Sequence, residues 1–266
     1  MSVLIGQLLV RTRDHISMKK NLLYHCYIKD IDDINETMIF NLKCLETYID
    51  VFDGKKIVYV AVDSVGRYSN EKIVEALPIL KRFDEIHLFE NHPIHRESES
   101  LIRLLSHVKD STDSISFYGH SKGSTHPIDN TLRNWILCMY YFNLDGDYLK
   151  EAEQQLSTNY TTSGILKKDC KTDGIIGDWH YSGAFFWIND EKFFKNEWSS
   201  MGLLNPMALE SYLGQKIKSS EAFSTFVTES FNFHMDDDLW KRKVNFETIG
   251  EKSYERYTTI LHNLTN

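Results

Sequence analysis

A histidine, a serine and a lysine stand together in the segment 119–123, which reads GHSKG. The pattern G-x-S-x-G presents a nucleophilic serine when a helix starts directly behind it. Here Pro127 follows six residues after Ser121 and favours a loop instead. Because we also find no HGGG-like oxyanion loop, a serine hydrolase of the α/β type with Ser121 as nucleophile is the alternative hypothesis rather than the leading one.

The same segment suits the binding of a diphosphate. His120 and Lys122 alternate at the end of a predicted strand, so both side chains can point to one side. They would offer an imidazole and a cation to the phosphates, and lysine is a common phosphate ligand. Ser121 lies between them. A solvent-exposed Lys-Gly turn is the structural alternative.

Two further polar residues end neighbouring hydrophobic strands. Asp63 closes the run VYVAVD, where a carboxylate could accept hydrogen bonds from a base or a ribose. His25 lies among aromatic residues near the end of the first strand and could face the same ligand. The structural alternatives are a turn cap for Asp63 and a hydrogen-bonded core residue for His25.

The densest aromatic segment is WHYSGAFFW, residues 179–187. Tryptophan and tyrosine combine an apolar face with a polar edge, which suits stacking on sugars, and a glycine lets the backbone approach a ligand closely. Alternation of the later aromatic residues is equally typical of a core strand. We expect the first part of the segment to face a ligand and the later aromatic residues to pack.

A single glutamate, Glu210, lies among apolar neighbours in a predicted helix, where it could act as a general base. Most helical glutamates are simply solvated. The acidic cluster at 234–238 contains His234 and Asp236, and an imidazole with carboxylate oxygens could hold Mg²⁺ or Mn²⁺. Charge runs of this kind are more often a solvated surface.

Alternating strands and helices must position these residues. Four hydrophobic runs predict strands over 21–28, 55–63, 85–91 and 115–120. Apolar residues at helical spacing predict helices between them, capped by Asn35 and Asn70, and a third helix over 101–108. Beyond them we expect helices over 132–144, 148–156 and 206–217, the last capped by Asn205, and a strand over 182–189.

This order predicts a single α/β domain with a Rossmann-like, mostly parallel sheet flanked by helices. Ligands of such sheets bind beyond the carboxyl ends of the strands. His25, Asp63 and His120 all belong to that edge.

The charge balance excludes a general nucleic-acid binder. The chain has 30 Lys and Arg against 38 Asp and Glu, a net charge of −8, whereas phosphate backbones need a basic surface. Four widely spaced cysteines suit a reducing compartment. The apolar run 2–10 is too short to span a bilayer and lacks the flanks of a secretory signal. We expect a cytoplasmic protein without a transmembrane segment, with peripheral membrane association open.

Together these motifs resemble the GT-A class of glycosyltransferases. The features that carry the resemblance are the strand that ends in Asp63, FYGHSKG at 117–123, WHYSGAFFW at 179–187 and the helix that bears Glu210. The chain is similar to a bacterial and viral subgroup with His-x-Lys-Gly in place of the Asp-x-Asp motif. The resemblance covers roughly residues 20–220.

The resemblance implies a nucleotide-diphosphate sugar as donor, a glycan or lipid-linked acceptor, and transfer of a hexosyl or deoxyhexosyl group. The implied catalytic base is Glu210. The donor site would consist of His25, Asp63, His120, Ser121 and Lys122. The acceptor site would consist of Trp179, His180, Tyr181, Ser182 and Gly183.

The wider class holds Mn²⁺ or Mg²⁺ with two aspartates where this chain has His120 and Lys122. Lys122 could neutralise the leaving diphosphate itself, while His234 and Asp236 keep a divalent metal open. We expect a nucleotide-sugar-binding half at 20–125, an acceptor and catalytic half at 126–220, and a C-terminal extension at 221–266. A non-catalytic nucleotide- or sugar-binding module is the alternative from outside the enzymes.

Overall fold

Seven strands form one sheet in the order β3-β2-β1-β4-β8-β5-β9. The computed structural model describes residues 18–32, 34–63, 66, 68–91, 97–169, 176–200, 208–226 and 249–265. The strands of this sheet are β1 (Lys19–Ile28), β2 (Lys56–Val62), β3 (Glu85–Glu90), β4 (Ser114–His120), β5 (Thr162–Gly164), β8 (Phe186–Asn189) and β9 (Ala222–Ser224). A separate ribbon pairs β6 (Lys167–Lys168) with β7 (His180–Tyr181).

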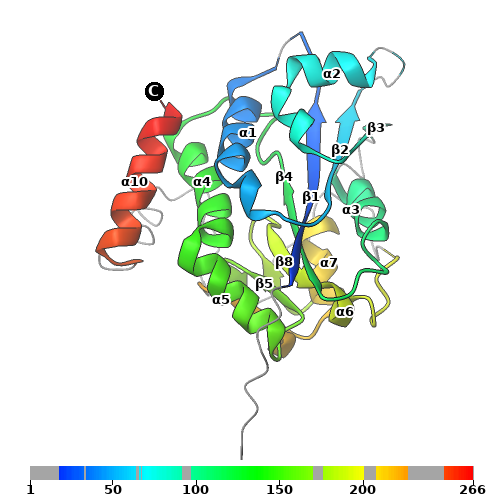
Figure 1. Ribbon diagram of the computed structural model, residues 1–266, viewed down its shortest axis with the longest axis vertical. Coiled ribbons are helices and arrows are strands. Elements are labelled where there is room, and N and C mark those ends of the chain that lie inside the picture. The colour runs from blue at the N-terminus through cyan, green and yellow to red at the C-terminus, as the bar shows by residue number, and fades with distance from the viewer. Residues whose placement is uncertain are drawn as a thin grey trace, which may run out of the picture.

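Helices cover both faces of the sheet (Figure 1). The cluster on one face includes residues of α1, α4 and α10, and the cluster on the other includes residues of α3 and α7. The α-helices are α1 (Glu36–Tyr48), α2 (Asn70–Ala76), α3 (Glu97–Ser106), α4 (Asn130–Leu144), α5 (Gly146–Ser157), α6 (Asp190–Phe193), α7 (Ala208–Lys216) and α10 (Glu251–Thr265). Short 3₁₀ turns are η1 (Ile49–Val51), η3 (Pro78–Arg82) and η4 (Ser219–Glu221).

The strands β1 to β4 are parallel to one another, and β8 runs antiparallel to both β4 and β5. Every residue of β4 is buried, which explains its continuous hydrophobic and aromatic sequence. The α/β prediction with a mostly parallel, Rossmann-like sheet is confirmed. Because β5, β8 and β9 extend the same sheet, both expected halves share one sheet, and the functional division between them stays a prediction.

Local signals placed the first helix correctly and misplaced the second. Asn35 caps α1 by accepting a hydrogen bond from the backbone of Met38, as expected. The cap of α2 is Ser69 rather than Asn70. The helix also ends at Ala76, because Pro78 disfavours helical geometry just before it and starts a 3₁₀ turn.

The aromatic segment is a shorter strand than expected. β8 begins at Phe186 rather than at residue 182, because Gly183 and Ala184 have φ angles of +90° and +55° and make a turn. A side chain at Gly183 would lie 2.8 Å from the sulfur of Met139, so glycine is required there.

The described part of the predicted helix over 206–217 is α7; its expected cap, Asn205, lies outside the described residues. Among the described residues, no helix combines the length and the apolar character needed to cross a membrane.

A buried carboxylate of α6 is hydrogen-bonded to β1 and β4 at the end of the sheet that lies opposite the carboxyl ends of these strands. Oδ2 of Asp190 accepts hydrogen bonds from Ser116 at 3.0 Å, from Asn21 at 3.2 Å and from Ser114. Asp190 is fully buried, and this burial raises its pKa to about 6 against the opposing effect of the three hydrogen bonds. The carboxyl group is therefore protonated in mildly acidic solution in the folded state.

The Asp190 group makes the free energy of unfolding depend on pH. Its pKa is higher in the folded than in the unfolded chain, so the stability it contributes is complete below pH 4 and is lost as the pH rises through 6. The stability of the wild type relative to Asp190→Asn should fall by about 2 kcal/mol between pH 4 and pH 7, as measured by urea unfolding. Asp147→Asn, at an exposed side chain, should show no such trend. If the free energies of unfolding of the wild type and of Asp190→Asn differed by the same amount at pH 4 and at pH 7, the raised pKa would be wrong.

Candidate functional site

A cleft of about 570 Å³ opens at the carboxyl ends of the parallel strands. β1 and β4 end beside each other there, because their parallel register pairs His25 with His120. The segment that follows β4 forms one wall, and Glu97 at the start of α3 contributes to the lining. The lining residues are His25, Tyr27, Asn91, Glu97, His120, Ser121, Lys122, Gly123, Ser124, Thr125 and His126.

The side-chain amide of Asn41 fixes the backbone of Lys122. Its Oδ1 accepts from the Lys122 N–H at 3.1 Å, and its Nδ2 donates to the Lys122 carbonyl at 2.9 Å. Asn41 is fully buried in α1. Because both backbone polar groups of Lys122 are held, the start of the cleft loop keeps one position relative to α1.

The first turn of α1 holds the rest of the loop. The hydroxyl of Thr37 donates to the carbonyl of His126 at 2.7 Å, and the amide of Asn35 donates to the carbonyl of Ser124. Residues 121–129 thus form a supported loop between β4 and α4, and α4 begins only at Asn130.

Two neutral histidines form the floor of the cleft. The Ser100 hydroxyl lies 2.8 Å from His25 Nδ1 and donates to the carbonyl of Glu97, so it accepts the proton of Nδ1. His120 Nε2 lies 2.9 Å from the carbonyl of Gly183, which can only accept, so this nitrogen carries the proton. The bare nitrogens are then Nε2 of His25 and Nδ1 of His120.

Burial keeps these imidazoles uncharged. It lowers the pKa of His25 to about 4, and together with the nearby Lys122 ammonium it lowers the pKa of His120 to about 3. At pH 7 both rings are therefore neutral groups that can each accept a hydrogen bond.

Lys122 and Glu210 form an ion pair beside this floor. The Lys122 Nζ lies 3.7 Å from Glu210 Oε1, and it also lies 5.6 Å from the ring centre of Trp135. The same Glu210 oxygen accepts from the Gly183 N–H at 3.3 Å. The two residues lie 88 positions apart in the sequence, and their side chains are about three-quarters or more buried.

Asp63 lies on the exposed rim. Its Oδ1 accepts from the Tyr27 hydroxyl at 3.0 Å and from the Asn91 amide at 3.4 Å. Tyr27 and Asn91 both line the cleft, so the carboxylate borders it through these two residues.

The aromatic residues expected on the acceptor side lie in the core instead. The Trp179 indole donates to the carbonyl of Ile217 at 2.8 Å, and the Tyr181 hydroxyl donates to the carbonyl of Phe223 at 2.5 Å. Both side chains are about 2% exposed or less. Their polar groups are hydrogen-bonded to backbone carbonyls, and their rings are packed in the core, so they offer no exposed face to a sugar.

The neighbouring residues of this segment lie closer to His120 and Glu210. Gly183 contacts both His120 and Glu210 through its backbone. His180 is buried, and this burial lowers its pKa while Glu210 opposes the effect. Its Nδ1 has no hydrogen-bond partner among the described residues. Ser182 is buried and donates its backbone N–H to Leu166.

Ser121 lacks the surroundings of a catalytic serine. Its hydroxyl accepts from the backbone N–H of Tyr27 at 3.0 Å, and the chain continues as a loop rather than as the helix that a nucleophile elbow requires. Within the described ranges no hydrogen bond joins its hydroxyl to a histidine. The geometry therefore favours a role for Ser121 in holding β1 to β4.

The structure brings His25, His120, Ser121, Lys122 and Glu210 together and puts Asp63 at the rim. The predicted metal ligands His234 and Asp236 lie outside the described residues. Sequence reasoning missed the positioning residues Asn41 and Ser100. Asn41 could have been found from its spacing. It precedes Leu45 by four positions and therefore shares the apolar face of the helix, where a polar residue is unusual.

This arrangement can bind an anion and move a proton. The Lys122 ammonium supplies positive charge in an acidic chain, and the neutral histidines accept hydrogen bonds. The Glu210 carboxylate can take up a proton from a hydroxyl group that reaches it.

Comparisons with known proteins give little beyond this geometry. No protein-family model matches the chain, and no curated protein sequence does so either. Among solved structures the chain is similar to a crystal structure of 4-diphosphocytidyl-2C-methyl-D-erythritol synthase, over 94% of this chain and 99% of that one. The sequence identity is 11% and the TM-score is 0.38. A similarity of this size transfers neither ligand nor reaction.

Removing the Asn41 amide should loosen the cleft loop. Asn41→Leu leaves the carbonyl of Lys122 without this donor, which should lower the free energy of unfolding by about 1–3 kcal/mol. Hydrogen exchange measured by mass spectrometry should speed up over residues 121–126. The matched control is Asn196→Leu, at an exposed asparagine whose amide bonds carbonyls of its own turn. Unchanged exchange in the Asn41 variant would contradict the clamp.

Proposed function

We propose that the chain is a GT-A-like glycosyltransferase that moves a sugar from a nucleotide-diphosphate donor to a glycan or lipid-linked acceptor. The observation that carries the proposal is the Lys122–Glu210 pair at the end of β4, beside the cleft of about 570 Å³. At the crevice of a mostly parallel sheet, a cation can stabilise a leaving diphosphate and a carboxylate can act as a general base.

The donor would lie across the carboxyl ends of β1, β2 and β4. Asp63 on the rim would accept hydrogen bonds from the base or the ribose. Lys122 would bind the diphosphate as a point charge, while His25 and His120 behind it would accept hydrogen bonds from hydroxyl groups. The clamp of Asn41 on the Lys122 backbone supports this placement, because it fixes the position from which the lysine side chain reaches the diphosphate.

Glu210 would act as the base. It takes the proton of the acceptor hydroxyl while the hydroxyl oxygen forms its bond to the anomeric carbon. The bond from that carbon to the diphosphate oxygen breaks, and its electron pair leaves with the diphosphate, next to the Lys122 ammonium. Gly183 N–H holds the reacting carboxylate oxygen in position.

The ion pair would regulate the base. Without donor, the Lys122 ammonium is shared with Glu210 at 3.7 Å. A bound diphosphate carries more negative charge than one carboxylate and competes for the ammonium, which frees Glu210 for the acceptor. On this proposal donor binding precedes acceptor activation.

The strand end does not fit the divalent metal that the wider class uses. Lys122 is itself a cation there, and its ammonium would repel a divalent ion at the same place. We therefore route no step of the reaction through a metal. On the acceptor side, the described contacts favour His180, Ser182 and Gly183 next to Glu210, with Trp179 and Tyr181 as their support.

Binding of a nucleotide-diphosphate sugar should raise the melting temperature. A donor at one hundred times its Kd should shift it by about 5–10 °C in a thermal-shift panel of such sugars. Lys122→Met should lose most of the shift, whereas Lys150→Met, at an exposed lysine, should keep it. If no nucleotide-sugar shifts the wild type at millimolar concentration, the proposed function is wrong.

Turnover should separate the two catalytic hypotheses. Glu210→Gln should lower kcat for donor hydrolysis or transfer by about 10²–10⁴-fold, because the base is lost. Its melting-temperature shift with donor should persist. Ser121→Ala should keep most of the transfer activity, and Glu191→Gln, at an exposed glutamate, should keep all of it. A thermal shift without turnover of any donor would instead identify a binding module, and loss of activity in the Ser121 variant alone would favour a hydrolase.

A further inference from the structure

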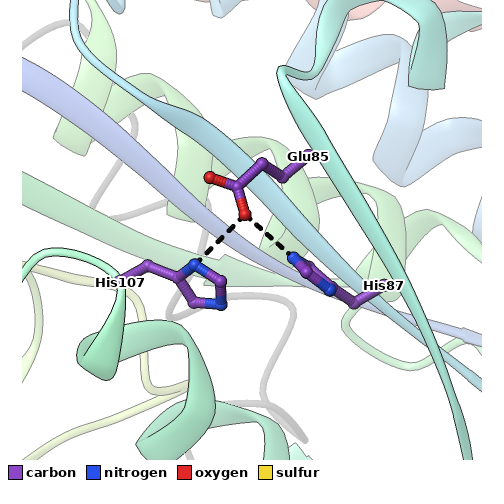
Figure 2. Close-up of side chains that lie close together, drawn as sticks. All are labelled: Glu85, His87 and His107. Atoms are coloured by element: carbon purple, nitrogen blue, oxygen red, sulfur yellow. Dashed lines mark hydrogen bonds and ion pairs between the residues drawn. The ribbon is translucent and has the colours of Figure 1, made fainter.

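We infer that Glu85, His87 and His107 form a binding site for a transition-metal ion, best matched by Zn²⁺, at the amino end of β3. Figure 2 shows the three side chains converging, with Glu85 between the two imidazoles. Their ligand atoms all lie within 4.8 Å of one another. This cluster lies outside the cleft and takes no part in the proposed transfer.

The fold brings the three residues together from two elements. Glu85 and His87 are two positions apart on β3, so their side chains point to the same face of the sheet. His107 follows the last residue of α3, and this helix packs on that face through the cluster that also contains Tyr59 of β2. In the sequence, Glu-x-His and a histidine twenty residues later give only a weak signal.

The two distances from Glu85 to the imidazoles are close to those around a tetrahedral ion. Glu85 Oε2 lies 3.0 Å from His87 Nε2 and 3.2 Å from His107 Nδ1. Zn²⁺ bonds of about 2.0–2.1 Å in tetrahedral geometry separate neighbouring ligand atoms by about 3.3–3.4 Å. Shifts of a few tenths of an ångström would therefore admit the ion between Glu85 and each imidazole.

Neighbouring groups orient the imidazoles as metal ligands need. His107 Nε2 lies 3.1 Å from the Tyr59 hydroxyl, which can accept the proton of Nε2 and leave Nδ1 free to bind metal. The ring of Tyr59 also stacks on that of His87 at 4.6 Å. Lys55 Nζ donates to the carbonyl of His107 at 2.8 Å and fixes the end of the helix.

The donor set selects the kind of metal. Two imidazoles and one carboxylate suit Zn²⁺ and similar transition metals, whereas Mg²⁺ and Ca²⁺ prefer oxygen ligands. The side chains of Glu85, His87 and His107 are 41%, 36% and 20% exposed, so an ion and a fourth ligand such as water have access.

The site is too far from the cleft to assist there. Residue 91 of the cleft lining follows Glu85 by six positions along β3, which spans about 20 Å at the rise of a parallel strand. The ion would instead tie the edge strand β3 to the end of α3. Its effect would be on stability rather than on the transfer.

Metal titration of the full chain tests the inference. Metals are first removed with a chelator and dialysis. Isothermal titration with ZnCl₂ at pH 7.5 should then show that one Zn²⁺ ion binds per chain, with a higher affinity than any further ions bound at the surface. Saturating Zn²⁺ should raise the melting temperature by about 5–10 °C. MgCl₂ should give neither effect.

Substitutions of the three ligands test whether the tightly bound Zn²⁺ ion occupies this site. Glu85→Gln, His87→Asn and His107→Asn should each weaken the binding of that ion by at least about tenfold. His262→Asn, which removes a histidine from α10, should bind as the wild type does. Circular dichroism checks that each variant is folded. Absence of a tightly bound Zn²⁺ ion in the wild type, or its retention in all three variants, would overturn the inference, and neither result bears on nucleotide-sugar binding.

Discussion

The parallel pairing of β1 with β4 is the constraint on which the candidate site depends. It sets His25 directly beside His120. The antiparallel pairing of β4 with β8 then brings the loop after β4 next to the aromatic turn before β8. Both strands are buried almost throughout, so a slip in register would expose hydrophobic residues or bury unpaired polar ones. The hydrophobic core therefore fixes where the polar groups of the cleft lie.

Side-chain and backbone hydrogen bonds convert that register into a defined cleft. Asn41 binds both backbone polar groups of Lys122, the Ser100 hydroxyl binds His25, and the backbone of Gly183 binds His120 and Glu210. Each of these contacts joins residues far apart in the chain. The uncharged Asn41 thus positions the backbone of Lys122, while the Lys122 ammonium is paired with the Glu210 carboxylate.

The two ends of the sheet carry different chemistry. The carboxyl ends of β1 and β4 gather a cation, a carboxylate and two neutral imidazoles around a cleft. The opposite end contains a buried carboxylate, Asp190, and the exposed group of Glu85, His87 and His107. Separation by the length of a strand would let the proposed transfer site and the proposed metal site coexist, because charges screened by solvent interact little over such a distance.

The sequence by itself determined the α/β order, the strands β1 to β4 and the strand-end positions of His25, Asp63 and His120, because burial on both faces leaves a continuous apolar run that can be read locally. Tertiary structure alone decided that Lys122 meets Glu210 across 88 residues, that Asn41 clamps the loop, and that Trp179 turns into the core. It also decided that His107 reaches Glu85 and His87. Each of these contacts depends on how elements distant in the chain pack together. The number of residues between two positions does not reveal how close they lie in the folded chain.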